Sequence, residues 1–223
     1  MTGARFLRDP LLDEIGVEHG FGTRGAQPPD GCVRPRQVHG VVVASVDDAK
    51  TLSDDAADAV VCRVPGLPVA VVTADCVPIL LASSSGRTVA AVHAGWRGLA
   101  AGIVSAAIGR LADLSDEPLS AAIGPHIRSC CYEVDAPVVD AMQRRFGAAT
   151  RTALRSSRPG HDWIDLQFLV GLEFDRAGIA TTRVGATRAH CTACDAERFE
   201  SFRRDGPRAG RLIHWVAATS LPA

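Results

Sequence analysis

Short apolar runs are the clearest pattern along the chain, and they are concentrated in its first half. Each run is rich in Val, Ala, Leu or Ile and is bounded by Gly, Ser, Asp or Pro, which is typical of buried β-strands. The four runs are 41–46 (VVVASV), 69–73 (VAVVT), 77–82 (VPILLA) and 88–92 (TVAAV). We therefore expect the first half to be rich in sheet.

The hydrophobic period changes in the next segment. Between residues 98 and 114 apolar side chains recur at every fourth position, which predicts an amphipathic helix with one face on a core. The stripe consists of Leu99, Ile103, Ala107 and Leu111. This helix would follow the segment HAGWR directly, so His93 is expected at the end of a strand, just before a helix.

The second half alternates between the two patterns. A strand is expected at 119–123, helices near 135–146 and 165–177, and short strands near 181–185 and 211–217. Two segments rich in Pro, Gly and Arg, 24–35 and 149–162, are expected to be loops. The mixed order of strands and helices, without an internal repeat, predicts an α+β or layered α/β domain.

Size and composition narrow the class of protein. A chain of 223 residues can bury a full core, so residues 1–223 are expected to form one domain. The formal net charge is −1 and no cluster of Lys and Arg reaches the size typical of a nucleic-acid-binding surface, which argues against a nucleic-acid partner. The N-terminal segment has no apolar signal-peptide core, and no stretch reaches the roughly 18 to 20 apolar residues of a spanning helix. We expect a soluble, cytoplasmic protein without a membrane partner.

The cysteines indicate free thiols rather than a disulfide framework. They are seven in number, at positions 32, 62, 76, 130, 131, 191 and 194. An odd set with an adjacent pair suits a reducing compartment better than an oxidising one. Cys130 or Cys131 could be a nucleophile or a metal ligand, but buried packing thiols are the more frequent case. The CTAC segment at 191–194 has CxxC spacing, a weak signal without a second CxxC.

Three further residues form a candidate metal site. His39, Cys76 and His93 lie in the short segments RQVHG, TADC and HAGWRG. Two imidazoles and one thiolate suit zinc, and three protein ligands leave one position open, as in catalytic rather than structural sites. Each residue alone is weak evidence, because a single His at a strand end is more often structural and a single Cys is often a small buried hydrophobe.

Neighbouring residues indicate what such a site could do. A bound metal lowers the pKa of its water to about 7, which makes hydrolytic deamination of a purine available. Asp75, beside Cys76, is the candidate proton carrier. Arg24, Arg36 and Arg97 lie in Gly-containing turns, where a guanidinium could bind phosphate for phosphorolysis. The alternative is that these arginines are surface residues paired with nearby acids.

Longer motifs resemble a known family. They are RQVHG, TADCVPILL, AVHAGWRGLAAGIV, AAIGPHIRSCCYEVD, DLQ at 165–167 and CTAC followed by RFESFRRDGPRAGR. Together they resemble the YfiH-type family, once called multicopper polyphenol oxidases or laccase-domain proteins and now described as purine nucleoside phosphorylases. The match spans nearly the whole chain. Two positions depart from the family pattern, His126 where a cysteine is frequent and Ala193 where an aromatic residue is frequent.

The resemblance implies a layered α/β/β/α fold related to toxin deamidases that use a Cys/His pair. It also implies phosphorolysis of adenosine, guanosine, inosine and S-methyl-5′-thioadenosine, deamination of adenosine, and zinc as the metal, with copper as the alternative. Small-molecule nucleosides and phosphate are the expected partners of a monomer or homodimer. We assign Cys76, Asp75 and Arg97 to catalysis, Arg24, Arg36 and Gln37 to substrate binding, and His39, Cys76 and His93 to the metal.

Other functions remain open on the sequence. Some relatives are associated with editing of peptidoglycan precursors, in which a nucleophilic Cys76 or a zinc hydroxide would attack an amide. The older copper oxidase label ranks last, because the chain offers only seven histidines and a thiolate with imidazoles also suits zinc. A non-enzymatic module with a structural zinc would normally show a fourth Cys or His ligand.

Overall fold

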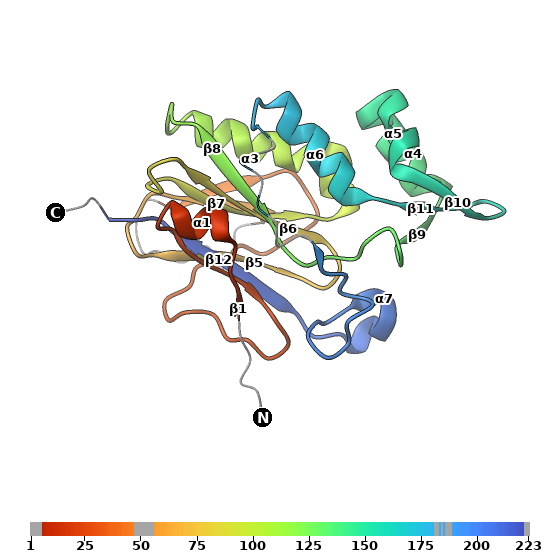
Figure 1. The fold of residues 1–223 in the computed structure, drawn as a ribbon, viewed down its shortest axis with the longest axis horizontal. Coiled ribbons are helices and arrows are strands. Elements are labelled where there is room, and N and C mark those ends of the chain that lie inside the picture. The colour runs from red at the N-terminus through yellow and green to blue at the C-terminus, as the bar shows by residue number, and fades with distance from the viewer. Residues whose placement is uncertain (1–5, 47–55, 181–182, 184, 186–188, 221–223) are drawn as a thin grey trace.

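Two stacked sheets and a layer of helices form the protein (Figure 1). The structure is a computed structural model that describes residues 6–46, 56–180, 183, 185 and 189–220. The five-stranded sheet is the larger one and lies in the middle. Helices cover one of its faces and the four-stranded sheet covers the other. The expected layered, mixed-sheet α+β fold is confirmed.

The larger sheet has five strands and mixed direction. Its first two strands are parallel and the other pairs are antiparallel. In spatial order the strands are β3 (Val43–Val46), β4 (Ala59–Cys62), β7 (Val89–Ala94), β6 (Val77–Ser83) and β8 (Leu119–Ile123). The central strands consist almost entirely of apolar residues, with Ser83 and His93 as the polar exceptions, because both faces of this sheet are buried.

The second sheet joins the two ends of the chain. It is antiparallel, with the order β1 (Phe6–Leu7), β2 (Glu18–Gly22), β12 (Leu212–Ala217) and β5 (Pro68–Thr73). A third, smaller sheet has the order β10 (Leu154–Arg158), β11 (His161–Ile164) and β9 (Glu133–Asp135). Strand β12, near the C-terminus, therefore lies between β2 and β5 and pairs with both.

The helices are short, and several begin at a side-chain cap. They are α1 (Pro10–Glu14), α2 (Trp96–Ala101), α3 (Ile103–Ala112), α4 (Ala136–Phe146), α5 (Thr150–Ala153), α6 (Leu166–Arg176) and α7 (Phe202–Asp205), with 3₁₀ turns η1 (Gly147–Ala149) and η4 (Gly206–Arg208). Asp165 caps α6 through the N–H of Phe168, and Ser201 caps α7 through the N–H of Arg204. No helix within the described ranges is both long and apolar enough to span a bilayer.

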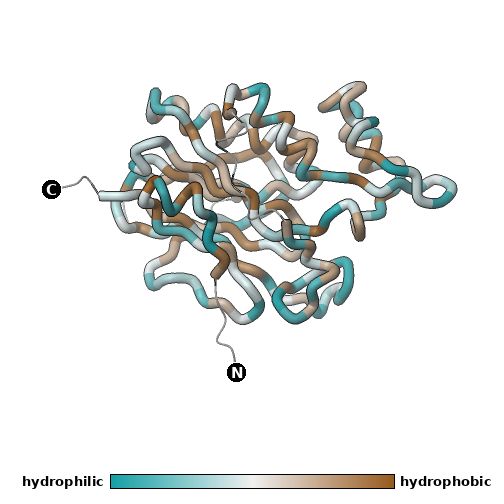
Figure 2. Tube along the Cα trace, in the orientation of Figure 1, coloured by the Kyte–Doolittle hydropathy of each residue, from teal (hydrophilic) through white to brown (hydrophobic). Residues whose placement is uncertain are grey.

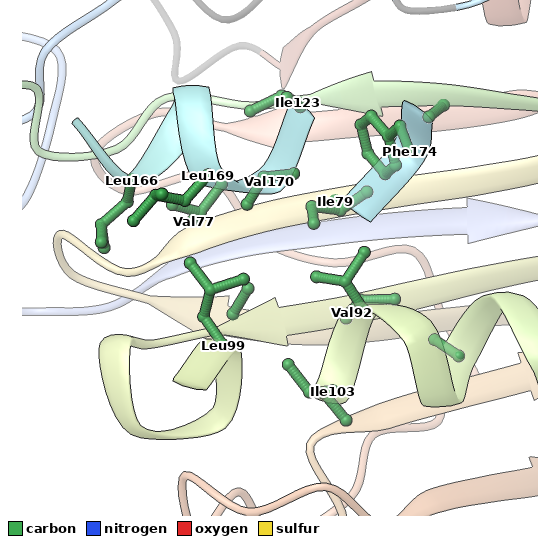
Figure 3. Packing of buried hydrophobic residues seen from close by; sticks show 14 of the residues in the cluster. Val77, Ile79, Val92, Leu99, Ile103, Ile123, Leu166, Leu169, Val170 and Phe174 are labelled. Atoms are coloured by element: carbon green, nitrogen blue, oxygen red, sulfur yellow. The ribbon is translucent and has the colours of Figure 1, made fainter. Parts of the chain in front are cut away.

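Alternating side chains divide the interior into two cores. On β6, Ile79 and Leu81 face the helices, whereas Leu80 between them faces the second sheet. Figure 3 shows the helical side, where Val92 of β7 lies between residues of α3 and α6. Apolar residues accordingly follow the inner strands and polar residues follow the outer loops (Figure 2).

Most sequence-predicted elements are confirmed, but the helix predicted over 98–114 is interrupted. It consists of α2 and α3, separated by Gly102 in a left-handed conformation with φ of 101°. A Cβ at Gly102 would lie 3.1 Å from the guanidinium of Arg145, so the break lets α4 approach the turn. Apolar periodicity does not reveal this break, because the stripe continues across it.

Other predictions were wrong or incomplete. The loop expected at 149–162 contains α5 and most of the β10–β11 hairpin, whose half-exposed polar strands lack an apolar signature. The strand near 181–185 falls largely outside the described residues. Strands β2 and β4 were missed; β4, with the sequence AVVC, is too short to give a periodic signal.

Candidate metal centre and its cavity

Three of the predicted residues converge on one point. His39, Cys76 and His93 each offer a ligand atom, and these atoms all lie within 4.8 Å of one another. The two imidazole rings meet edge to face, with centroids 4.8 Å apart. His93 is buried, Cys76 is half-buried and His39 is exposed, so the cluster opens on one side.

The central antiparallel pair of strands places two of these residues. Cys76 directly precedes β6, and His93 lies opposite Pro78 in the β6–β7 register. Asp75 has a φ of 91°, a left-handed conformation that turns the chain sharply into β6. The register of a buried sheet is strongly specified, so it holds the thiol and the imidazole side by side.

A buried carboxylate positions both histidines. Asp58, just before β4, accepts a hydrogen bond from Nδ1 of His93 at 2.8 Å and from the backbone N–H of His39 at 2.9 Å. It also accepts from the backbone N–H groups of Val38 and Gly40, at 3.2 and 2.6 Å. Because Nδ1 is engaged, His93 presents Nε2 toward the cluster, which is the usual arrangement behind a metal-ligating imidazole.

Gly95 provides the space that the cluster needs. A Cβ at this position would lie 2.9 Å from Cδ2 of His39 and 3.1 Å from Sγ of Cys76. The φ of Gly95 is −71°, which any residue can adopt. Glycine is therefore needed here for the space it leaves and not for its backbone conformation.

The electrostatics favour a thiolate beside a charged imidazole. Burial raises the pKa of the Cys76 thiol, but hydrogen bonds with His39 and His93 lower it more, to about 7. Burial lowers the pKa of His93, but the hydrogen bond with Asp58 and the contact with Cys76 raise it to about 9. A thiolate with two imidazoles fits a borderline-soft cation such as zinc, and the open side leaves a coordination position toward the cavity.

The cluster lies in the wall of a cavity of about 860 Å³. The cavity wall is strongly basic and carries three aromatic side chains. The arginines are Arg34, Arg36, Arg97, Arg203 and Arg211, and the aromatic residues are Trp96, Tyr132 and Phe202. A volume of this size suits a small-molecule ligand, and the arginines favour an anionic one.

Four of the other assigned residues also line this cavity, namely Asp75, Arg36, Gln37 and Arg97. The amide of Gln37 pairs at both ends with the backbone of Val72, at 2.7 and 2.8 Å, so it anchors the loop to the edge of β5. The guanidinium of Arg97 lies 4.2 Å above the ring of Trp96. The carboxylate of Asp75 accepts from Oγ1 of Thr192 and from the backbone N–H of Arg203, both at 2.6 Å.

The structure does not bring Arg24 into this group. Its guanidinium pairs with Glu200 at 2.7 Å and donates to the carbonyl of Phe199 at 3.0 Å, and it does not belong to the cavity wall. Sequence reasoning missed Asp58, Arg34, Arg203 and Arg211. Asp58 had one usable signal, an acidic residue directly before a buried apolar strand, whereas nothing in the sequence separates these arginines from the others.

Comparisons with known proteins show which family and which named proteins the chain is similar to. The model of the family described as multi-copper polyphenol oxidoreductase laccase matches residues 21–219. A purine nucleoside phosphorylase of Xylella fastidiosa is 39% identical over 188 residues, which cover 81% of this chain and 70% of the relative. A protein from an unknown prokaryotic organism, named adenosine deaminase RL5, is 33% identical, covering 82% of this chain and 74% of the relative.

A solved structure shares the fold. The crystal structure of the Bacillus licheniformis hypothetical protein YfiH superposes with a TM-score of 0.84 at 24% identity, covering 93% of this chain and 94% of the other. At 24% identity this similarity shows a shared fold and does not extend to function.

Proposed function

This chain belongs to the YfiH family, whose model is described as multi-copper polyphenol oxidoreductase laccase, and we propose that it is a zinc-dependent purine nucleoside phosphorylase that also deaminates adenosine. The observation that carries the proposal is the open His39, Cys76 and His93 cluster in the wall of a basic, aromatic cavity. The names of its relatives, purine nucleoside phosphorylase and adenosine deaminase, support both activities. The substrates proposed are adenosine, guanosine, inosine and S-methyl-5′-thioadenosine.

In phosphorolysis a phosphate oxygen bonds to C1′ of the ribose while the bond from C1′ to the purine nitrogen breaks. The electron pair of that bond goes to the purine, which takes up a proton and leaves as the free base. We propose that Arg36 and Arg97 hold the phosphate, because two guanidinium groups can offset its charge and fix its direction of attack. The aromatic residues Tyr132 and Phe202 would hold the base.

Deamination in the same cavity uses water in place of phosphate: the water oxygen bonds to C6 of the adenine ring, the bond from C6 to the amino nitrogen breaks, and its electron pair leaves with ammonia. Zinc bound at the cluster would supply Lewis acidity and a water of lowered pKa. Asp75 is the proposed carrier of the proton to the leaving ammonia. Each of its carboxylate oxygens already accepts one hydrogen bond and has a second lone pair available, so this role requires no loss of the contacts to Thr192 and Arg203.

The test incubates the zinc-loaded protein with adenosine, with and without phosphate, and separates the products. Adenine and ribose 1-phosphate should appear only with phosphate. Inosine should appear in both reactions, and with phosphate part of it should be cleaved further to hypoxanthine. Cys76→Ala should lose both activities, while Cys32→Ala, a loop thiol outside the cavity, should retain them. Absence of all three products would refute the proposal, and deamination retained in Cys76→Ala would assign that activity to another site.

A second candidate rests on the hydrogen-bonded pair of Cys76 and His93. A thiol with a pKa of about 7 beside an imidazole is the arrangement of a cysteine nucleophile. Such a pair could hydrolyse an amide in a nucleotide-linked peptidoglycan precursor. Release of the amino acid by protein stripped of metal would favour this candidate, and dependence on added zinc would count against it. A copper oxidase site is not supported, since within the described residues the cluster holds only two imidazoles.

A further inference from the structure

Four cysteines converge in a second cluster, outside the cavity wall. Cys130 and Cys131 lie in the turn before β9, and Cys191 and Cys194 come from the CTAC segment some 60 residues later. Their sulfur atoms all lie within 4.8 Å of one another. The expectation of buried packing thiols is wrong for Cys130, which is exposed together with Cys194.

The sulfur spacing matches a single tetrahedral ion. Four sulfurs at the usual zinc–sulfur distance of about 2.3 Å lie about 3.8 Å from each other. Here Sγ of Cys194 is 3.3 Å from that of Cys131 and 3.6 Å from that of Cys130. A disulfide would instead bring one pair to about 2.05 Å, but all of these cysteines are free and Cys194 is shared between two neighbours.

Backbone N–H groups are directed at one of the sulfurs. The N–H of Arg128 lies 3.4 Å from Sγ of Cys191. The backbone N–H groups of Ala193 and Cys194 also donate to this sulfur. Hydrogen bonds of this kind stabilise a thiolate, the form that binds a metal, and orient it.

Strand-like pairing holds the two segments together without any metal. His126 and Cys191 form a parallel bridge, in which the N–H of Thr192 donates to the carbonyl of His126 at 3.0 Å. The four thiols are therefore brought together by the fold itself.

We propose that Cys130, Cys131, Cys191 and Cys194 bind a structural zinc ion. A shell of four thiolates is complete, so it leaves no position for substrate, in contrast to the three-ligand cluster in the cavity. Soft thiolates at this spacing select zinc over harder cations.

The position of this ion suggests what it stabilises. Arg203, a cavity residue, donates from its guanidinium to the carbonyl of Cys131 at 3.2 Å and lies 5.2 Å from the ring centre of Tyr132. Thr192, between the two cysteines of the CTAC segment, donates a hydrogen bond from its hydroxyl to the carboxylate of Asp75. The ion would therefore link the segments that form one wall of the cavity, and its removal should loosen that wall without removing the cavity metal.

The test counts zinc per chain in protein purified without added metal. We expect two equivalents in the wild type, one in Cys191→Ser/Cys194→Ser, and one in Cys76→Ala. Cobalt loaded into Cys76→Ala should give the intense visible and near-ultraviolet bands of a tetrathiolate site, and these should be absent from the double serine variant. A single equivalent in the wild type that is lost in Cys76→Ala would overturn the proposal, and iron in place of zinc would overturn the choice of metal.

A second measurement needs no variant and remains decisive if the serine variant does not fold. Iodoacetamide should leave the exposed Cys130 and Cys194 of the native protein unmodified until a strong chelator is added, whereas Cys32 should react equally with and without chelator. Rapid alkylation of Cys130 and Cys194 before chelation would refute the site. A Cys131–Cys194 disulfide in the protein as isolated, detected by mass without reduction, would also refute it.

Discussion

Oδ1 of Asp58 lies 2.8 Å from Nδ1 of His93, and the same oxygen accepts the backbone N–H of His39 at 2.9 Å. A single oxygen of this buried carboxylate therefore orients the side chain of His93 on the central strand β7. The same oxygen also fixes the loop that carries His39, just before the edge strand β3. The residue that organises the cluster is one that does not belong to it.

Asp58→Asn should weaken metal binding while leaving the three ligands in place. An amide has a single acceptor oxygen, so it can serve His93 and His39 in the place of Oδ1 or Val38 and Gly40 in the place of Oδ2, but not both pairs. Loss of such a partner typically costs about 10- to 100-fold in metal affinity. Competition with a zinc chelator measures this change. Asp140→Asn, an exposed substitution on α4, is the control, and equal affinities in the two variants would contradict the role of Asp58.

Gly95→Ala should lower zinc affinity and both activities without unfolding the protein. The added methyl would contact His39 at 2.9 Å and Cys76 at 3.1 Å, which pushes the ligands apart. Gly109→Ala is the matched control, because a Cβ there meets no atom within 4 Å and α3 continues through the position. The control should keep full zinc affinity and gain roughly 0.5 to 1 kcal/mol of stability. Normal zinc binding by Gly95→Ala would refute the steric argument.

Arg36→Ala should raise the KM for phosphate more than the KM for the nucleoside. Hydrogen bonds to charged groups contribute roughly 1.5 to 3 kcal/mol, so an increase of about tenfold or more is expected. Initial rates over a phosphate series at saturating inosine measure it. Arg151→Ala, an exposed arginine of α5 outside the cavity wall, should behave as wild type. An unchanged phosphate KM in Arg36→Ala would remove this residue from phosphate binding.

Phe202→Ala should raise the KM for the nucleoside more than the KM for phosphate. The side chain of Phe202 is 53% exposed and borders the cavity, where its ring is free to stack on a purine base. Base–aromatic stacking contributes about 1 to 3 kcal/mol, so the KM for inosine should rise about tenfold. The phosphate KM of the same variant is the internal control, and a parallel rise in both constants would indicate a collapsed cavity instead.

Glu173→Gln, a substitution on α6 outside the cavity wall, should lower the free energy of unfolding. The buried carboxylate of Glu173 pairs with Arg145 at 2.8 Å and Arg176 at 3.1 Å and also accepts from Ser105. Burial raises the pKa of Glu173, but Arg145, Ser105 and Arg176 lower it below its ordinary value. Because Arg145 and Arg176 are partly exposed, the expected loss is that of hydrogen bonds to a charged group, roughly 1.5 to 3 kcal/mol, which urea unfolding at pH 7 should reveal.

The pH dependence of this effect has a definite sign. Because the folded-state pKa of Glu173 is depressed, its contribution is complete above the unfolded-state value of about 4.3 and is lost as pH falls through the folded-state value. The difference in free energy of unfolding between the wild type and Glu173→Gln should therefore become smaller as the pH falls below about 4.3. Glu197→Gln, at an exposed position, should show no such difference from the wild type at any pH.

Some features of the site could be read from local sequence. Cys76 and His93 border apolar runs long enough to be recognised as strands, and the strand at 119–123 and the helix at 165–177 were placed within a residue or two. Arg24 shows the limit of this reasoning, because its turn resembles that of Arg36, but Glu200 at 2.7 Å engages it outside the cavity. The choice between two similar turns depends on a residue that lies far along the chain.

The sequence by itself predicted most strands and helices and their mixed order, because alternation, helical period and tight turns act over a few neighbouring residues, and it offered His39, Cys76 and His93 as candidate ligands. Only the tertiary structure decided that Asp58 holds His93, that Gly102 divides a helix and that four distant cysteines meet. Each of these depends on strand pairing or packing between segments far apart in the chain. Such contacts are set by the balance of burial, hydrogen bonding and excluded volume in the whole fold, and no local pattern encodes them.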